Sequence, residues 1–222
     1  MPALRVSELT MRFAGLDRPA LAIPALTLDA GSQVAITGPS GSGKTTLLNL
    51  LTGLERASGG SVCWSATDLT ALGESARDRW RAAHVGLVMQ DFHLLPGLSA
   101  IDNVLLPQRL ARLRLPQATR TEAERLLRRV GLERIEQTVD TLSRGQMQRV
   151  AVARALVAGP GIVVADEPTA SLDADAGAAV ADLLSGLARD TGATLIVASH
   201  DPLFVGRLDR VLRLEAGRIV QP

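Results

Sequence analysis

The chain is poor in several features, and each scarcity excludes a class of protein. It has one cysteine, Cys63, and therefore cannot form an intramolecular disulfide. Its longest apolar stretches, such as residues 161–165 and 193–198, are strand-sized and far shorter than the roughly 20 residues that cross a bilayer. The first ten residues lack the basic and then apolar layout of a signal peptide. These absences predict a cytosolic protein without a membrane span.

A surplus of positive charge is also missing. The 24 basic and 23 acidic residues leave a net charge of +1, which disfavours nucleic acid as a partner. The arginine-rich residues 109–134 allow a nucleic-acid patch, but leucines recur there at spacings of three and four. That spacing favours an inserted helical subdomain with a solvated arginine face. The apolar fraction of 46% is enough for a sizeable core in one compact domain.

Lysine is nearly absent, because Lys44 is the only one in the chain. Lysine carries a compact ammonium on a thin stem, whereas arginine carries a planar fork, so a narrow loop that must receive one point charge cannot exchange the two. Lys44 lies in residues 38–45, which match the pattern G-x-x-x-x-G-K-[ST]. A predicted strand, 33–37, precedes this pattern and a predicted helix, 45–54, follows it. This context predicts a phosphate-binding loop rather than an ordinary glycine and serine turn.

Each part of this loop has a physical role in holding phosphate. Its glycines let backbone N–H groups curl around a phosphate, and the helix N-terminus adds partial positive charge. Lys44 reaches the terminal phosphates, and the Thr45 hydroxyl can bind Mg²⁺. The residues predicted to bind nucleotide here are Gly38, Pro39, Ser40, Gly41, Ser42, Gly43, Lys44, Thr45 and Thr46.

Two adjacent carboxylates, Asp166 and Glu167, follow the buried-type strand predicted at 162–165. If that strand lies parallel to the strand before the loop, its carboxyl end delivers both acids to the phosphates. Asp166 would then hold Mg²⁺ through its water shell, and Glu167 would act as the general base for the attacking water. The alternative is a polar strand end before the turn at Pro168, which the neighbouring phosphate loop disfavours.

Strands and helices alternate along most of the chain, which predicts an α/β fold with a mostly parallel sheet covered on both faces. In such sheets, ligands bind beyond the carboxyl ends of the strands. The predicted strands are residues 4–9, 23–28, 33–37, 61–64, 85–89, 162–165, 194–198, 211–214 and 218–220. The predicted helices of the sheet region are 45–54 and 174–189.

Residues 142–146, Leu-Ser-Arg-Gly-Gln, resemble the signature motif of the ABC transporter nucleotide-binding family. Gln90 resembles the family's Q-loop glutamine, residues 171–173 its D-loop, and His200 its switch histidine. Phe13 stands where the family usually has an aromatic that stacks on adenine, although a core phenylalanine is an equally good interpretation. The chain departs from the pattern at Arg144, where the family most often has glycine.

The resemblance implies the fold and domain organisation in more detail. It implies a P-loop NTPase core with a mostly parallel central sheet, an N-terminal antiparallel β subdomain and an inserted α-helical subdomain. Residues 1–222 would form one ABC ATPase domain. Within it, about 1–90 and 156–222 would form the core and β subdomain, and about 91–155 the helical subdomain with the signature.

The resemblance also implies a mechanism, in which two copies sandwich two ATP molecules. Each phosphate loop would face the signature of the opposite copy, so Ser143, Gly145, Gln146 and Asp173 would bind nucleotide across the dimer. Gln90 would sense Mg²⁺, and His200 would contact the γ-phosphate. The implied catalytic residues are Lys44, Gln90, Glu167 and His200, and the implied metal-binding residues are Thr45, Gln90 and Asp166.

Residues 90–107 resemble the subgroup that includes lipoprotein-release, macrolide-export and FtsE-type ATPases. This resemblance implies a separate ATPase subunit bound to integral-membrane permease subunits on the cytoplasmic face of the inner membrane. A regulatory, FtsE-type ATPase that moves a membrane partner without cargo is the alternative. An ABC ATPase acting on ribosomes or DNA is less favoured, because 222 residues hold neither a second cassette nor a long coiled-coil insertion.

Overall fold

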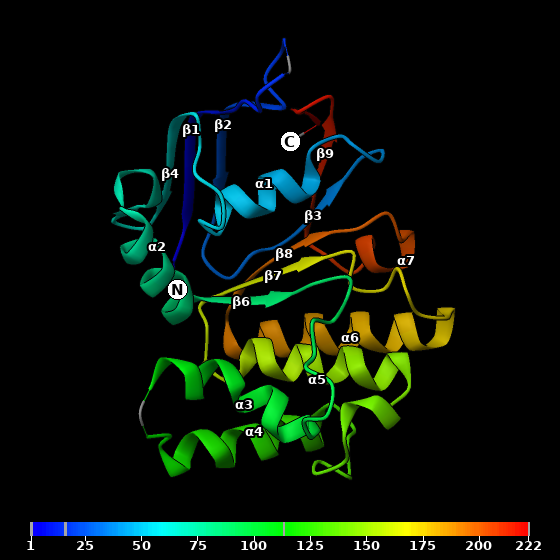
Figure 1. Ribbon diagram of the computed structural model, residues 1–222. Helices are drawn as coiled ribbons and strands as arrows, with labels where there is room; N and C mark the ends of the chain where they lie inside the picture. Colours follow the sequence, from blue (N-terminus) through cyan, green and yellow to red (C-terminus); the bar gives the residue numbers. More distant parts are fainter. Residues whose placement is uncertain (1, 16, 113, 222) are drawn as a thin grey trace.

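The computed structural model describes residues 2–15, 17–112 and 114–221 (Figure 1). The N-terminal part forms a four-stranded sheet in the order β2-β1-β4-β5, with antiparallel pairing throughout. Leu4 and Val6 of β1 point into the core while their neighbours are exposed, as expected for a sheet with one buried face. The implied antiparallel β subdomain is therefore confirmed. Its strands are β1 (Leu4–Met11), β2 (Leu21–Leu28), β4 (Gly59–Trp64) and β5 (Thr67–Asp68).

A second, six-stranded sheet has the order β10-β9-β3-β8-β7-β6. All its pairings are parallel except the one between β9 and the edge strand β10, so the predicted mostly parallel sheet is confirmed. Its strands are β3 (Gln33–Thr37), β6 (Val85–Val88), β7 (Ile162–Asp166), β8 (Thr194–Ala198), β9 (Arg210–Glu215) and β10 (Arg218–Gln221).

The two faces of this sheet belong to two hydrophobic cores. Along β7, Ile162 and Val164 pack with α1 and the N-terminal sheet, whereas Val163 and Ala165 pack with the helices of the other face. This alternation follows from the two-residue period of a strand and explains why central strands are apolar without interruption. The helices are α1 (Lys44–Leu51), α2 (Glu74–His84), α3 (Ala100–Ala111), α4 (Gln117–Arg129), α5 (Arg144–Leu156), α6 (Ala174–Thr191) and α7 (Pro202–Val205).

Figure 1 shows how these helices are distributed. Helix α1 lies between the two sheets, whereas α5 and α6 lie along the opposite face of the parallel sheet, with α3 and α4 packed beyond them. Short 3₁₀ turns at Leu69–Ala71 and Val139–Thr141 complete the described elements. Among the described residues, no helix combines the length and apolar character that a membrane span requires.

Two predicted helical stretches differ most from the structure. The helical stretch predicted at 109–134 is two helices: α3 already begins at Ala100, and α4 begins only after Pro116. Proline disfavours helical backbone in the residue before it and suits the start of a helix, so the chain restarts a helix there. The helix predicted to reach Leu54 ends at Leu51, because Gly53 turns to a φ of 69°. Leu54 is consequently 41% exposed.

Candidate nucleotide site

The carboxyl ends of β3, β7 and β8 meet at one edge of the parallel sheet, where a cleft of about 1110 Å³ opens. Sequence positions far apart are gathered there by the parallel pairing of these strands. The predicted site residues that line the cleft are Phe13, Gly38, Pro39, Ser40, Gly41, Gly43, Lys44, Thr45, Thr46, Gln90, Asp166, Glu167 and His200.

The phosphate loop depends on glycine at two points. Gly38 has a φ of 149°, and a Cβ there would come within 2.1 Å of the Leu214 carbonyl oxygen. Gly43, at a φ of 102°, precedes α1 and leaves the first N–H groups of the helix without a capping side chain. Those groups and the helix dipole favour an anion at this end of α1.

Lys44, the first residue of α1, folds back across the loop. Its ammonium donates hydrogen bonds to the carbonyl oxygens of Gly38 at 2.9 Å and Pro39 at 3.3 Å. Ser42 does not line the cleft but is buried beneath the loop, where its carbonyl oxygen accepts a hydrogen bond from Gly217 N–H at 3.0 Å. The turn between β9 and β10 therefore supports the loop from below.

An oxygen-rich pair lies beside the lysine. The Thr45 hydroxyl donates to the Asp166 carboxylate at 2.7 Å, which joins the start of α1 to the end of β7. A hydroxyl, a carboxylate and the nearby Gln90 amide form an all-oxygen donor set of the kind that Mg²⁺ prefers. The residues present therefore fit this metal.

Glu167 and His200 form the second pair of the cleft. The imidazole Nδ1 lies 2.8 Å from a Glu167 carboxylate oxygen, which joins the residues that follow β7 and β8. Glu167 has a φ of 46°, a left-handed conformation that costs about 1–3 kcal/mol in a residue other than glycine. Its N–H donates to the Ala198 carbonyl at 2.8 Å, and its side chain is only 16% exposed. A carboxylate fixed in this way can accept a proton from a water in the cleft.

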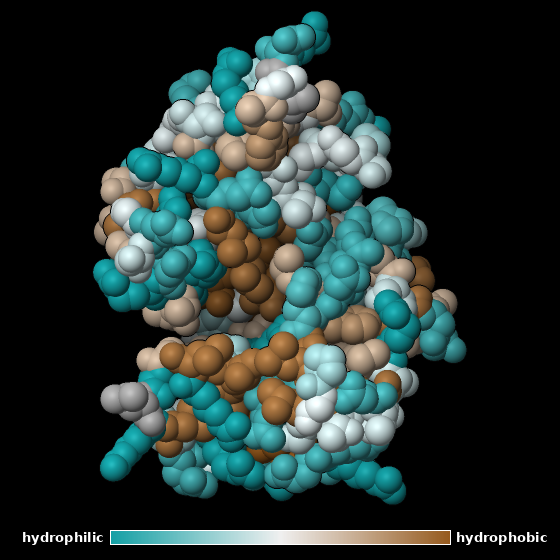
Figure 2. Space-filling view, viewed as in Figure 1, coloured by the Kyte–Doolittle hydropathy of each residue, from teal (hydrophilic) through white to brown (hydrophobic). Residues whose placement is uncertain are grey.

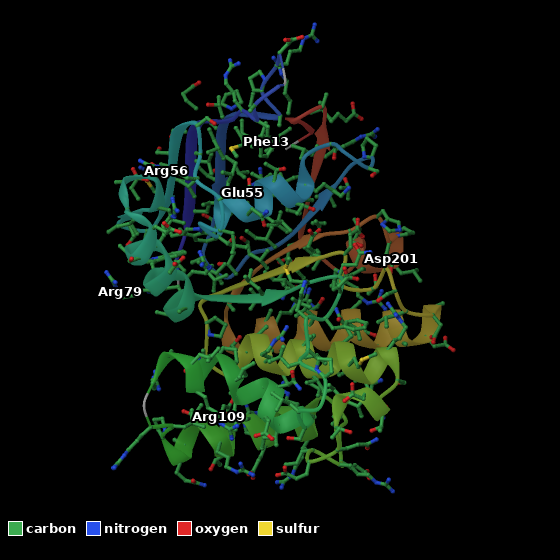
Figure 3. The ribbon with its side chains drawn as sticks, viewed as in Figure 1. Phe13, Glu55, Arg56, Arg79, Arg109 and Asp201 are labelled. Carbon is green, nitrogen blue, oxygen red and sulfur yellow. The ribbon has the colours of Figure 1, made fainter. Side chains whose placement is uncertain are left out.

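Phe13, which follows β1 in the chain, also lines the cleft. Figure 3 shows it near the top of the view, above α1, whereas Asp201, the neighbour of His200, lies at the right-hand end of the sheet. Phe13 is 41% exposed and lines the cleft, so its interpretation as a core phenylalanine is wrong. An exposed ring at this position can stack on a flat base.

Sequence reasoning missed two segments of the cleft wall. Residues 17–20 line it from the chain after β1, and the turn at Ala216 and Gly217 lines it from the far end of the sheet. A Cβ on Gly217 would come within 2.3 Å of the Ala20 carbonyl, so the two segments touch. The one sequence signal for these segments was Gly217, because a glycine between two short predicted strands marks a tight turn.

The signature residues lie outside the cleft of their own copy. Ser143 caps α5: its hydroxyl accepts from Gln146 N–H at 3.2 Å, and its own N–H donates to the Gln146 side chain at 2.9 Å. Asp173 caps α6 by accepting from Ala176 N–H at 2.8 Å. Neither these residues nor Gly145 are among those that line the cleft.

The fold and the cleft define a P-loop nucleotide hydrolase, since a phosphate loop joins a parallel strand to a helix beside a strand that ends in two acids. Its family is shown by comparison, because the profile of the ABC transporter family matches residues 21–170. The chain therefore belongs to the ABC transporter family and is the ATP-binding subunit of a transporter, an ABC-type ATPase.

Several of the proteins similar to this chain are named LolD. The lipoprotein-releasing system ATP-binding protein LolD of Pseudomonas syringae pv. tomato is 45% identical over 197 residues, covering 88% of this chain and 86% of the relative. LolD of Chromohalobacter salexigens is 42% identical over 228 residues, covering 98% and 96%. The ABC transporter ATP-binding protein YbbA of Escherichia coli is 44% identical and covers 87% and 85%.

Solved structures agree with this assignment. The dimeric bacterial ABC transporter cassette MJ0796 superposes with a TM-score of 0.88 at 32% sequence identity, covering 98% of this chain and 97% of the other. A dimeric post-hydrolysis state of the same cassette, bound to ADP and Pi, gives a TM-score of 0.86 over the same shares. The implied cassette fold is thus confirmed.

Proposed function

We propose that this chain drives a membrane permease of the lipoprotein-release type by forming a homodimer that closes on two ATP molecules and reopens after hydrolysis. The proposal rests on one observation: the signature residues lie outside the cleft that holds the other predicted site residues. The cleft holds the phosphate loop, both acids and the histidine, whereas Ser143 and Gly145 lie elsewhere on the same copy. A second copy supplies them most simply, and two solved structures of a similar cassette are dimeric.

Within one copy, the proposed roles follow from the contacts. Lys44 and the glycine loop hold the β- and γ-phosphates, and Phe13 stacks on adenine. Thr45, Asp166 and Gln90 would hold Mg²⁺, and the ion would neutralise phosphate charge. Glu167 takes a proton from the attacking water, and His200 orients that carboxylate through the 2.8 Å contact.

Across the dimer, we propose that Ser143, Gly145, Gln146 and Asp173 contact the ATP of the other copy. Ser143 and Gln146 sit on the first turn of α5, so the partial positive charge of that helix end would face the γ-phosphate. The capping box holds both side chains in place before the partner arrives.

The proposed permease would bind near the hollow between the β-rich part and the helical part of the molecule. Figure 2 shows apolar residues gathered on both sides of that hollow. Leu54, Leu95 and Leu110 are 41%, 48% and 80% exposed, so their side chains are available to pack against a partner. Binding to such a permease would place the chain at the cytoplasmic face of the membrane.

The Glu167→Gln variant tests the dimer and the general base together. It keeps the shape of the side chain and removes the base, so ATP turnover should fall about a hundredfold or more while ATP binding persists. Its mass in solution should double when Mg²⁺-ATP is added and stay monomeric without nucleotide. Full hydrolysis by the variant would remove Glu167 from this role.

The cargo needs a separate test with the chain's own permease in vesicles. ATP-dependent release of a fluorescent lipoprotein would support the lipoprotein-release assignment. If the permease stimulates ATP hydrolysis and no lipoprotein leaves the vesicles, the chain drives a different cargo.

A further inference from the structure

Arg144, at the position where the ABC family most often has glycine, makes two contacts within its own copy. Its Nε–H donates to the Ser171 carbonyl oxygen at 3.0 Å, and its guanidinium carbon lies 5.2 Å from the centre of the Phe92 ring. Arg144 is exposed, but these two contacts hold its guanidinium against its own copy. It joins the first turn of α5 to two segments that are distant in sequence.

The first of these segments follows Gln90 and is strained. Phe92 and His93 have φ values of 40° and 48°, in the left-handed region that bulky residues avoid. Two arginine side chains of α5 contact these same residues. Arg144 covers the Phe92 ring, which is only 7% exposed, and Arg154 donates to the carbonyl oxygens of Phe92 and His93 at 2.6 and 2.5 Å.

The second segment lies between Glu167 and Asp173. Its start is also held by α5, because the fully buried Gln148 donates from Nε2 to the Pro168 carbonyl at 2.8 Å. Arg144 adds a hydrogen bond to the Ser171 carbonyl, three residues further on. Helix α5 thus contacts the chain at two points, Pro168 and Ser171, that both follow Glu167.

We infer that Arg144 is a positioning residue that clamps the segments after Gln90 and after Glu167 to the signature helix, so that the three move as one body when ATP closes the dimer. The inference rests on the proposed function for its consequence in ATP turnover. The clamp itself is a property of one copy without nucleotide. Glycine at this position could make neither contact.

Arginine is suited to this role because its guanidinium is a rigid plane with donors at its edge. The guanidinium carbon lies over the Phe92 ring while Nε–H donates to the Ser171 carbonyl. A lysine ammonium can keep a cation near the ring or donate to the carbonyl, but it cannot fix both in one geometry. The variant Arg144→Lys should therefore retain only one of the two contacts at a time and clamp the two segments less firmly.

Hydrogen exchange of the nucleotide-free protein tests the clamp directly. In Arg144→Ala, amides of residues 91–94 and 169–172 should exchange at least several times faster than in the wild type, with Arg144→Lys intermediate. The matched control is Arg128→Ala, which removes an exposed arginine from α4 outside these contacts. Unchanged exchange in both segments would overturn the clamp.

Steady-state kinetics of the full chain tests the consequence of the clamp for ATP turnover. The kcat for ATP should fall about fivefold to tenfold in Arg144→Ala, with KM within about twofold and a smaller loss in Arg144→Lys. Phe92→Leu keeps the buried apolar volume but removes the ring, so combining it with Arg144→Ala should add little to the loss. Fully additive losses would show that the arginine acts elsewhere.

The other outcomes separate this inference from the proposed function. A raised KM with unchanged exchange would assign Arg144 to phosphate in the partner's site and overturn the clamp. Faster exchange with unchanged kcat would overturn its role in turnover. Absence of ATP binding and of an ATP-dependent dimer in Glu167→Gln would defeat the proposed function, while the exchange experiment would still decide the clamp.

Discussion

At the scale of single residues, the cleft concentrates side chains whose identity has no close substitute. Lys44 is the only lysine among 24 basic residues, and its ammonium fits between two loop carbonyls. Glu167 holds a strained backbone that keeps its carboxylate beside His200. Strain at a site residue persists only when its surroundings fix it, and here the hydrogen bond from Glu167 N–H to Ala198 does so.

Replacing Lys44 by alanine should weaken ATP binding about tenfold to a hundredfold, because the loop loses the charge that pairs with the terminal phosphates. Titration with a fluorescent ATP analogue measures this directly. Lys44→Arg is the informative control: the charge stays, but a planar fork does not fit between the Gly38 and Pro39 carbonyls. ATP binding by Lys44→Arg equal to that of the wild type would contradict the narrow-loop argument.

At the scale of elements, capped helix N-termini fix the positions of the residues proposed to contact the second copy. The N-termini of α5 and α6 are capped by Ser143 and Asp173, so both proposed dimer contacts sit at helix starts. Helix α3 is capped in a similar way by Ser99, whose hydroxyl accepts from Asp102 N–H at 3.1 Å and donates to the Asp102 carboxylate at 2.7 Å. This second bond, helped by Arg109, lowers the pKa of Asp102 below its usual value.

The free energy of unfolding of the Ser99→Ala variant should be about 1 kcal/mol lower than that of the wild type at neutral pH, because α3 loses its cap. The pH dependence has a definite sign. Since the pKa of Asp102 is lowered in the folded protein, its stabilising contribution is present above about pH 4 and is lost as pH falls through the folded value.

Denaturant unfolding at neutral pH and near pH 3 measures both effects. The difference between wild type and Ser99→Ala should be smaller at the acidic pH, whereas Ser99→Thr, which keeps the hydroxyl, should stay near the wild type. A difference that grows on acidification would show that the Ser99 to Asp102 bond does not favour the charged carboxylate.

At the scale of the whole molecule, the parallel sheet separates two cores and collects the site at one edge. The signature lies on the helical side, outside that cleft. Under the proposed function, one copy would carry two half-sites that do not face each other, and a two-fold dimer would complete them.

Mixing two inactive variants tests this arrangement. Lys44→Ala removes the charge of the phosphate loop, and Ser143→Arg places a bulky cation in the signature. In a mixed dimer one site keeps both intact halves, so an equimolar mixture should recover about a quarter of the wild-type ATPase activity if sites act independently. Each variant alone, at the same total concentration, is the control. No recovery at any ratio would refute sharing of sites between copies.

Sequence alone determined the parts that depend on local pattern. The G-x-x-x-x-G-K-[ST] loop, the apolar strands and the lone lysine are readable because each is contiguous, and the strand before the loop was predicted with its observed bounds, Gln33–Thr37. Boundaries set by backbone geometry were missed. Helix α1 ends at Leu51 rather than Leu54, and the helical stretch predicted at 109–134 is interrupted, with α4 beginning only after Pro116.

Only the tertiary structure decided what lies beside what. The 2.7 Å contact between Thr45 and Asp166 spans 121 positions, and the position of Arg144 between Phe92 and Ser171 follows from the packing of α5. A residue's type and neighbours in sequence do not specify such partners, because they depend on which strands pair and which helix faces meet. For that reason the sequence showed Arg144 only as a departure from a motif, and the fold showed what it holds.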